Sequence, residues 1–108
     1  MRRVIAYKRY FLDFYEMQRS EVQKKIEWVL GLLRDLEVIP TKYFKHVDGK
    51  IYEIRIQGGT NIFRIFAFFD KDNVIVLGNA LQKKTQKLRG KEIKLAKRIM
   101  EEYFDEKK

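Results

Sequence analysis

A dense cluster of cations directly follows an apolar stretch in the second half of the chain. The apolar residues VIVLGNAL give way to QKKTQK, which supplies Lys83, Lys84 and Lys87. Residues 82–98 hold eight lysines and arginines against one acid, Glu92, so this window alone carries a charge of +7. Clustered positive charge favours an anionic partner such as RNA, DNA or an acidic protein segment. A solvated basic surface explains the same pattern, and on charge alone the two interpretations have equal weight.

Two arginines stand in segments that read as strands. Arg55 and Glu53 occupy the polar positions of the alternating segment KIYEIRIQ, and Arg64 is the only charged residue in IFRIFAFF. A lone charge in an apolar strand is costly to bury unpaired, so we expect Arg64 to face solvent or a partner, with Arg55 on the same side. Two arginines and the nearby lysines could converge on one phosphate, because guanidinium groups match phosphate oxygens. The alternative is a structural Arg55 that pairs with Glu53 or another acid.

Candidates for proton transfer and for base stacking are few. His46 is the only histidine and could act as a general acid or base, although a lone loop histidine is more often incidental. Glu53 could accept a proton if it is unpaired and near substrate. Phe66 and Phe68 could stack on RNA bases. Phenylalanines at this density are more often core residues or are covered by a partner, and we favour that interpretation for both.

Composition excludes several classes of chemistry. The chain has no cysteine, so disulfides, thiolate metal sites and cysteine nucleophiles are absent, and the scattered carboxylates show no ligand spacing. We therefore predict no metal and no cofactor. Charges interrupt the basic N-terminus too early for a signal peptide, and no apolar run approaches the roughly 18 residues of a membrane span. With a net charge of +9, the sequence predicts a soluble cytoplasmic protein without membrane contact.

The length and the periodicity predict one α+β domain over residues 1–108. The expected order is strand, helix, helix, strand, strand, strand, helix, which gives a small antiparallel sheet mixed with an N-terminal strand. We expect the helices to pack on one face of this sheet. That face should carry the alternating apolar residues of the first two meander strands, namely Tyr52, Ile54, Ile56, Phe63, Ile65, Ala67 and Phe69. The opposite face would combine cations with aromatic residues.

Three motifs in order give the chain a family resemblance. They are Tyr52-Glu53-Ile54-Arg55, Phe63-Arg64-Ile65-Phe66 and Lys83-Lys84-Thr85-Gln86-Lys87. Through these motifs the sequence resembles the RelE/ParE superfamily of bacterial toxins, and within it the HigB-like, phage-derived branch. The resemblance covers nearly the whole chain. The resemblance implies the RelE-like fold and the toxin role of a type II toxin–antitoxin pair.

The resemblance also implies an activity and partners. Such toxins act in the 70S ribosome as mRNA interferases, endoribonucleases in which the 2′-hydroxyl attacks the adjacent phosphate without a metal. The usual partner is a helix-turn-helix antitoxin. Two other functions stay open: a toxin of the same fold that inhibits a protein target such as gyrase, and an RNA-binding module without catalysis.

Residue roles follow from the resemblance by position. Arg64 would hold the scissile phosphate, Arg55 would assist it, and Lys84 or Lys83 would add a further cation. Some ribonuclease members have a tyrosine or histidine near the C-terminal end of the site. In this chain neither occurs after Leu81 until Tyr103, which we expect on the buried stripe of the last helix. His46 and Glu53 are therefore the remaining candidates for proton transfer. The residues expected to contact RNA are Lys45, Phe66, Lys87, Arg89 and Lys91.

Overall fold

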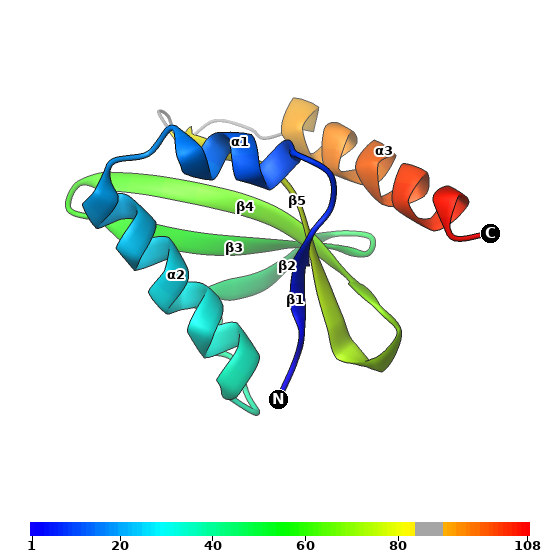
Figure 1. Cartoon of the computed structure of the whole chain (residues 1–108), viewed down its shortest axis with the longest axis horizontal. Coiled ribbons are helices and arrows are strands. Elements are labelled where there is room, and N and C mark those ends of the chain that lie inside the picture. The colour runs from blue at the N-terminus through cyan, green and yellow to red at the C-terminus, as the bar shows by residue number, and fades with distance from the viewer. Residues whose placement is uncertain (84–89) are drawn as a thin grey trace.

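The computed structural model describes residues 1–83 and 90–108 of the chain (Figure 1). The elements are β1 (Val4–Ala6), α1 (Tyr10–Glu16), α2 (Ser20–Asp35), β2 (Phe44–Asp48), β3 (Ile51–Gly58), β4 (Asn61–Asp70), the 3-10 turn η1 (Lys71–Asn73), β5 (Val74–Lys83) and α3 (Gly90–Glu106). This is the predicted α+β class, with the predicted order of helices and meander strands. Strand β2 is an addition. The sequence did not reveal it because FKHVD has no regular apolar alternation.

The five strands form one mixed sheet in the order β1-β5-β4-β3-β2. The N-terminal strand β1 pairs in parallel with β5, whereas the other neighbouring strands are antiparallel. Tight turns make the antiparallel pairing possible, and Gly59 between β3 and β4 has a φ of +62° that a glycine adopts without strain. Strand β4 is therefore central, as the nearly continuous apolar run in its sequence requires.

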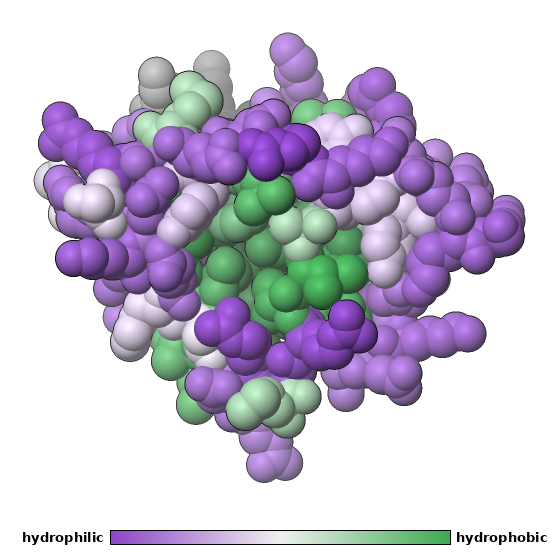
Figure 2. Space-filling view, in the orientation of Figure 1, coloured by the Kyte–Doolittle hydropathy of each residue, from purple (hydrophilic) through white to green (hydrophobic). Residues whose placement is uncertain are grey.

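Helices α1 and α2 cover one face of the sheet. The predicted apolar face meets them: Ile54, Ile56 and Ile65 are fully buried with Ile26 and Leu33 of α2 in one core cluster. Figure 2 shows apolar side chains at the centre of this side of the molecule, framed by hydrophilic side chains. The helix stripe and the strand alternation thus meet as their periods of about 3.6 and 2 residues predict.

Helix α3 packs on the opposite face, so the expectation that all helices share one face is wrong. Phe66, Phe68 and Val76 point to that side and are buried with Ala96 and Ile99 of α3. The physical reason is that β4 and β5 are apolar on both faces, and an uncovered second face would leave large aromatic surface in water.

Gly78 in β5 allows α3 to approach closely. A Cβ atom at this position would lie 3.4 Å from the Phe66 carbonyl oxygen and 3.7 Å from Ile99. At its N-terminal end the helix is held by Asn79, whose amide donates to the Glu92 carbonyl at 3.1 Å. At its other end the Tyr103 hydroxyl donates to Asp70 at 2.6 Å. The helix therefore covers the part of β5 between these contacts. Within the described residues, no helix is both long and apolar enough to cross a membrane.

Candidate functional site

Arg55 and Arg64 lie directly opposite each other on β3 and β4. They are on the face that α3 covers in part, because the intervening residues Ile54 and Ile65 point into the α1–α2 core. The prediction that the two arginines share one face is therefore confirmed. Their surroundings differ, since Arg55 is partly exposed and Arg64 is only 3% exposed.

Arg64 is paired with a carboxylate inside the protein. Its Nε lies 3.3 Å from an Oε of Glu53, and the Glu53 side chain is 1% exposed. In the register, Glu53 is opposite Phe66, which places it diagonally across from Arg64 on the same face. The expectation that Arg64 faces solvent is wrong, because a buried partner compensates its charge. Glu53 also does not meet the condition set for a proton acceptor, since it is paired.

A bulge in the sheet brings Lys83 to the arginine face. Before the bulge, Ala67 pairs with Leu77, and both point into the α1–α2 core. After it, Arg64 pairs with Leu81 and Ile62 with Lys83. The shift between Ile65 and Ala67 thus reverses which face the odd-numbered residues of β5 occupy. Lys83 consequently lies one side chain beyond Leu81 on the face of Arg55 and Arg64.

The rest of the cationic cluster is only partly described. The predicted site residues Lys84, Lys87 and Arg89 lie outside the described residues. Lys91 is exposed in the first turn of α3, after Gly90. Lys45 is exposed on β2 opposite Glu53, which puts it on the arginine face at the edge of the sheet.

His46 lies on the other face of the sheet. It pairs with Tyr52 in the β2–β3 register, and its ring packs edge-on against Tyr52 at a centroid distance of 5.5 Å. Its Nε2 is 2.6 Å from the carbonyl oxygen of Gly49, to which an Nε2–H would donate. The structure therefore does not bring His46 together with Arg55 and Arg64.

Phe66 and Phe68 are core residues. Phe66 has no exposed surface and Phe68 is 2% exposed, both beneath α3. The favoured interpretation of these residues is confirmed, and the expectation that Phe66 stacks on RNA is wrong, because no base reaches a side chain buried in this way.

Tyr103 belongs to a polar cluster at the C-terminal end of α3. Burial raises the pKa of Tyr103, and its hydroxyl donates to Asp70. The Lys107 ammonium group, the Tyr103 hydroxyl and the Lys71 backbone N–H lower the pKa of Asp70 to about 2. Asp70 is the last residue of β4, whereas Arg64 lies in the first half of that strand, so the cluster is separate from the arginine pair. Its contacts fasten α3 to the sheet.

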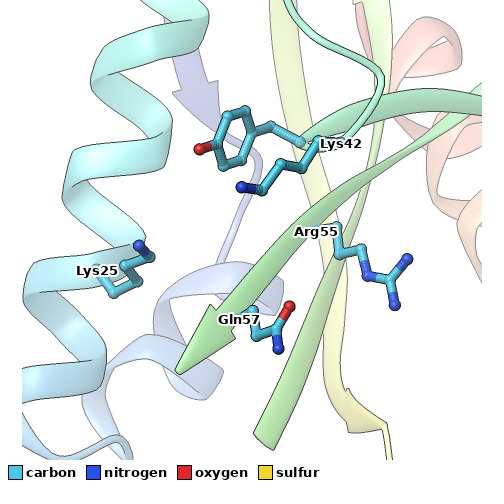
Figure 3. Close-up of a pocket in the computed structure, with 5 residues that line it drawn as sticks. Lys25, Lys42, Arg55 and Gln57 are labelled. Atoms are coloured by element: carbon cyan, nitrogen blue, oxygen red, sulfur yellow. The ribbon is translucent and has the colours of Figure 1, made fainter. Parts of the chain in front are cut away.

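A pocket beside Arg55 was not predicted. It measures about 400 Å³ and is lined by Lys25, Lys42, Tyr43, Arg55 and Gln57. In Figure 3, Lys42 extends toward α2, from which Lys25 projects, whereas Arg55 extends away from both. The one signal for this pocket in the sequence is positive charge, and Lys25 and Lys42 are too far apart along the chain for a motif to connect them.

The arrangement suits anion binding. Arg55 forms no ion pair with any of the described residues, and it shares its face with Lys83 and Lys45. Within residues 1–83 and 90–108, no group of three or more acids and histidines could hold a metal ion. Guanidinium and ammonium groups on one face can bind phosphoryl oxygens and stabilise negative charge that develops on them.

A comparison with known protein families matches residues 13–101, which include the second half of α1, all of α2, the arginine pair and most of α3. The matching family is described as phage derived protein Gp49-like (DUF891). No curated protein matches the chain. Because the match covers well over half of the residues, the chain belongs to the Gp49-like phage-derived family, a RelE/HigB-type toxin family of toxin–antitoxin systems.

Proposed function

We propose that this toxin is an endoribonuclease that cuts mRNA in the ribosome. The observation that carries the proposal is the cationic face of the sheet, where a partly exposed Arg55 lies opposite Arg64 and on the same face as Lys83. Membership of a RelE/HigB-type toxin family supports it, as does the overall charge of +9, which favours association with ribosomal RNA.

In the proposed reaction the 2′-hydroxyl oxygen bonds to the adjacent phosphorus while the bond from phosphorus to the 5′-oxygen breaks, which leaves a 2′,3′-cyclic phosphate. Water takes the hydroxyl proton and supplies a proton to the 5′-oxygen. Arg55 donates to the non-bridging phosphoryl oxygens, and Lys83 together with Lys84 adds positive charge. These groups stabilise the charge that grows in the transition state, and one such donor contributes about 10²- to 10³-fold in rate. Arg64 has a different role from the one first expected: through its buried pair with Glu53 it fixes the strand that carries Arg55.

The decisive test compares Arg55→Ala with Lys71→Ala. Lys71 serves as the matched control. It is an exposed cation in η1, which follows the C-terminal end of β4 and is distant from the position where β4 pairs with Arg55. Both variants would be induced in cells, followed by growth measurement and mapping of mRNA 5′ ends against ribosome positions. We expect Arg55→Ala to lose cleavage about 10²-fold or more, with Lys71→Ala unaffected. A folded Arg55→Ala protein that cuts mRNA at the parent rate would refute the proposed role.

A second candidate is a toxin of the same fold that inhibits a protein target such as gyrase. It is favoured by the positions of the two residues that the sequence offered for proton transfer: Glu53 is paired with Arg64, and His46 lies on the other face of the sheet. The basic surface would then be a docking surface. Supercoiling assays with purified toxin separate the two candidates, because an mRNA endonuclease leaves gyrase activity unchanged.

The toxin–antitoxin family implies an antitoxin partner. We propose that it is a helix-turn-helix protein which covers the cationic face, since an acidic surface there would neutralise the cations on which the reaction depends. Copurification of the toxin with the product of the neighbouring gene tests this, and Arg55→Glu should weaken the complex.

A further inference from the structure

The pocket between α2 and the edge of β3 has a chemistry of its own. Strand β2 stops pairing where Phe44 meets Ile54, and the Tyr43 carbonyl accepts the next hydrogen bond from the Arg55 N–H at 2.8 Å. Beyond this point β3 has an open edge. The pocket of about 400 Å³ lies there, with Lys25 of α2 on one side and Gln57 of β3 on the other (Figure 3).

The charges of this pocket are unbalanced. Lys25, Lys42 and Arg55 contribute three cations, and none of the described residues that line the pocket is an acid. None of these cations forms an ion pair with a described residue. Like charges that line one pocket repel one another, so an anionic ligand is the group that would balance them.

Aromatic side chains adjoin these cations. Trp28 is 50% exposed on α2, and its ring meets the Tyr43 ring edge-on at a centroid distance of 5.7 Å. The Lys25 ammonium group lies 4.6 Å from the centre of the Trp28 ring, and that of Lys42 lies 5.4 Å from the Tyr43 ring. Each lysine therefore stands over an aromatic ring; Tyr43 lines the pocket, and Trp28 contacts both Lys25 and Tyr43.

We propose that this pocket binds one nucleotide of a single-stranded RNA, with Lys25 and Lys42 on its phosphate and Trp28 or Tyr43 against its base. Aromatic surface next to cationic donors is the combination that binds unpaired nucleotides. The volume suits a single small ligand better than a peptide segment. The choice of RNA rests on the proposed function. Because Arg55 lines the pocket and also belongs to the proposed cleavage site, the pocket would adjoin that site and position the strand for it.

Trp28 makes the proposal directly measurable, because it is the only tryptophan of the chain. Purified toxin without ribosomes would be titrated with a hexauridylate while tryptophan fluorescence is recorded. We expect saturable quenching, because the RNA contacts the ring or its neighbours. Lys25→Ala/Lys42→Ala should weaken binding roughly tenfold and reduce the salt dependence of log K by about 0.7 for each lost contact. Lys71→Ala is the matched control and should bind as the parent does.

Two outcomes would overturn the proposal. One is unchanged affinity and salt dependence in the double lysine variant. The other is equal or stronger quenching of Trp28 by polyglutamate, which would assign the pocket to an acidic peptide. The assay is also independent of cleavage: if ribosomal mRNA is never cut but the RNA titration behaves as expected, the endonuclease proposal fails while the nucleotide pocket stands. If cleavage is confirmed and the double lysine variant binds RNA as the parent does, the nucleotide-pocket proposal fails while the endonuclease proposal stands.

Discussion

Removing the carboxylate of the buried ion pair should destabilise the protein severely. The charged groups of Glu53 and Arg64 approach to 3.3 Å, where their attraction is about 5 kcal/mol at an effective dielectric constant of 20. Glu53→Met keeps the side-chain length but leaves a guanidinium group that is 3% exposed without its counter-charge. We expect a loss of about 3–5 kcal/mol in the free energy of unfolding, which is a large part of the 5–15 kcal/mol typical of a domain.

Urea unfolding at 25 °C, followed by circular dichroism, measures this loss. The double variant Glu53→Met/Arg64→Met should recover at least half of it, because no buried charge remains and two apolar side chains pack in its place. Gln57→Met is the control, an exposed position on the same strand, and should change the free energy by less than about 0.5 kcal/mol. A loss below about 1 kcal/mol in Glu53→Met, or a double variant as unstable as the single one, would refute the reasoning.

Three further predictions concern the second face of the sheet. Phe66→Ala should cost about 3–5 kcal/mol in urea unfolding, since the ring has no exposed surface; normal stability with lost RNA binding would instead support base stacking. Gly78→Val should lower the free energy of unfolding by about 1–3 kcal/mol because the added atoms meet Ile99. A variant with the same melting temperature as the parent would contradict this. The pKa of Asp70 is about 2 in the folded protein and higher in the unfolded chain, so its stabilising effect is complete above pH 4 and is lost as pH falls toward 2. The Asp70→Asn protein should therefore have a lower melting temperature than the parent at pH 7, and its melting temperature should fall less between pH 4 and 2. Equal changes in the two proteins would contradict the stabilising role of the Asp70 cluster.

Local periodicity accounts for the features that were predicted correctly. The alternation of β3 and β4 depends only on the two-residue repeat of a strand, so the shared face of Arg55 and Arg64 followed from the sequence. The packing of Ile54 and Ile56 against helices followed for the same reason. Charge is also a property of sequence alone, and the +7 window of residues 82–98 needed no structure to be recognised.

The failures concern contacts between distant parts of the chain. Strand β2 forms because Phe44 stacks on Tyr52 across the sheet, at a centroid distance of 4.9 Å, and nothing within FKHVD indicates that partner. His46 was a candidate for proton transfer, and only its pairing with Tyr52 shows that it lies on the other face of the sheet from the arginines. The α3 side of the sheet was misjudged because an amphipathic helix shows that it has a buried stripe without showing which surface buries it.

By itself, the sequence determined which residues share a strand face, which helix stripes are buried and where positive charge accumulates, because each of these depends on neighbours a few positions away. The tertiary structure alone decided that Arg64 is neutralised by Glu53 and that a bulge beside Phe66 turns Lys83 to the arginine face. It also decided that Lys25 and Lys42 meet at the open edge of β3. Cross-strand register and helix placement set these contacts, and both are chosen by the packing of the whole chain.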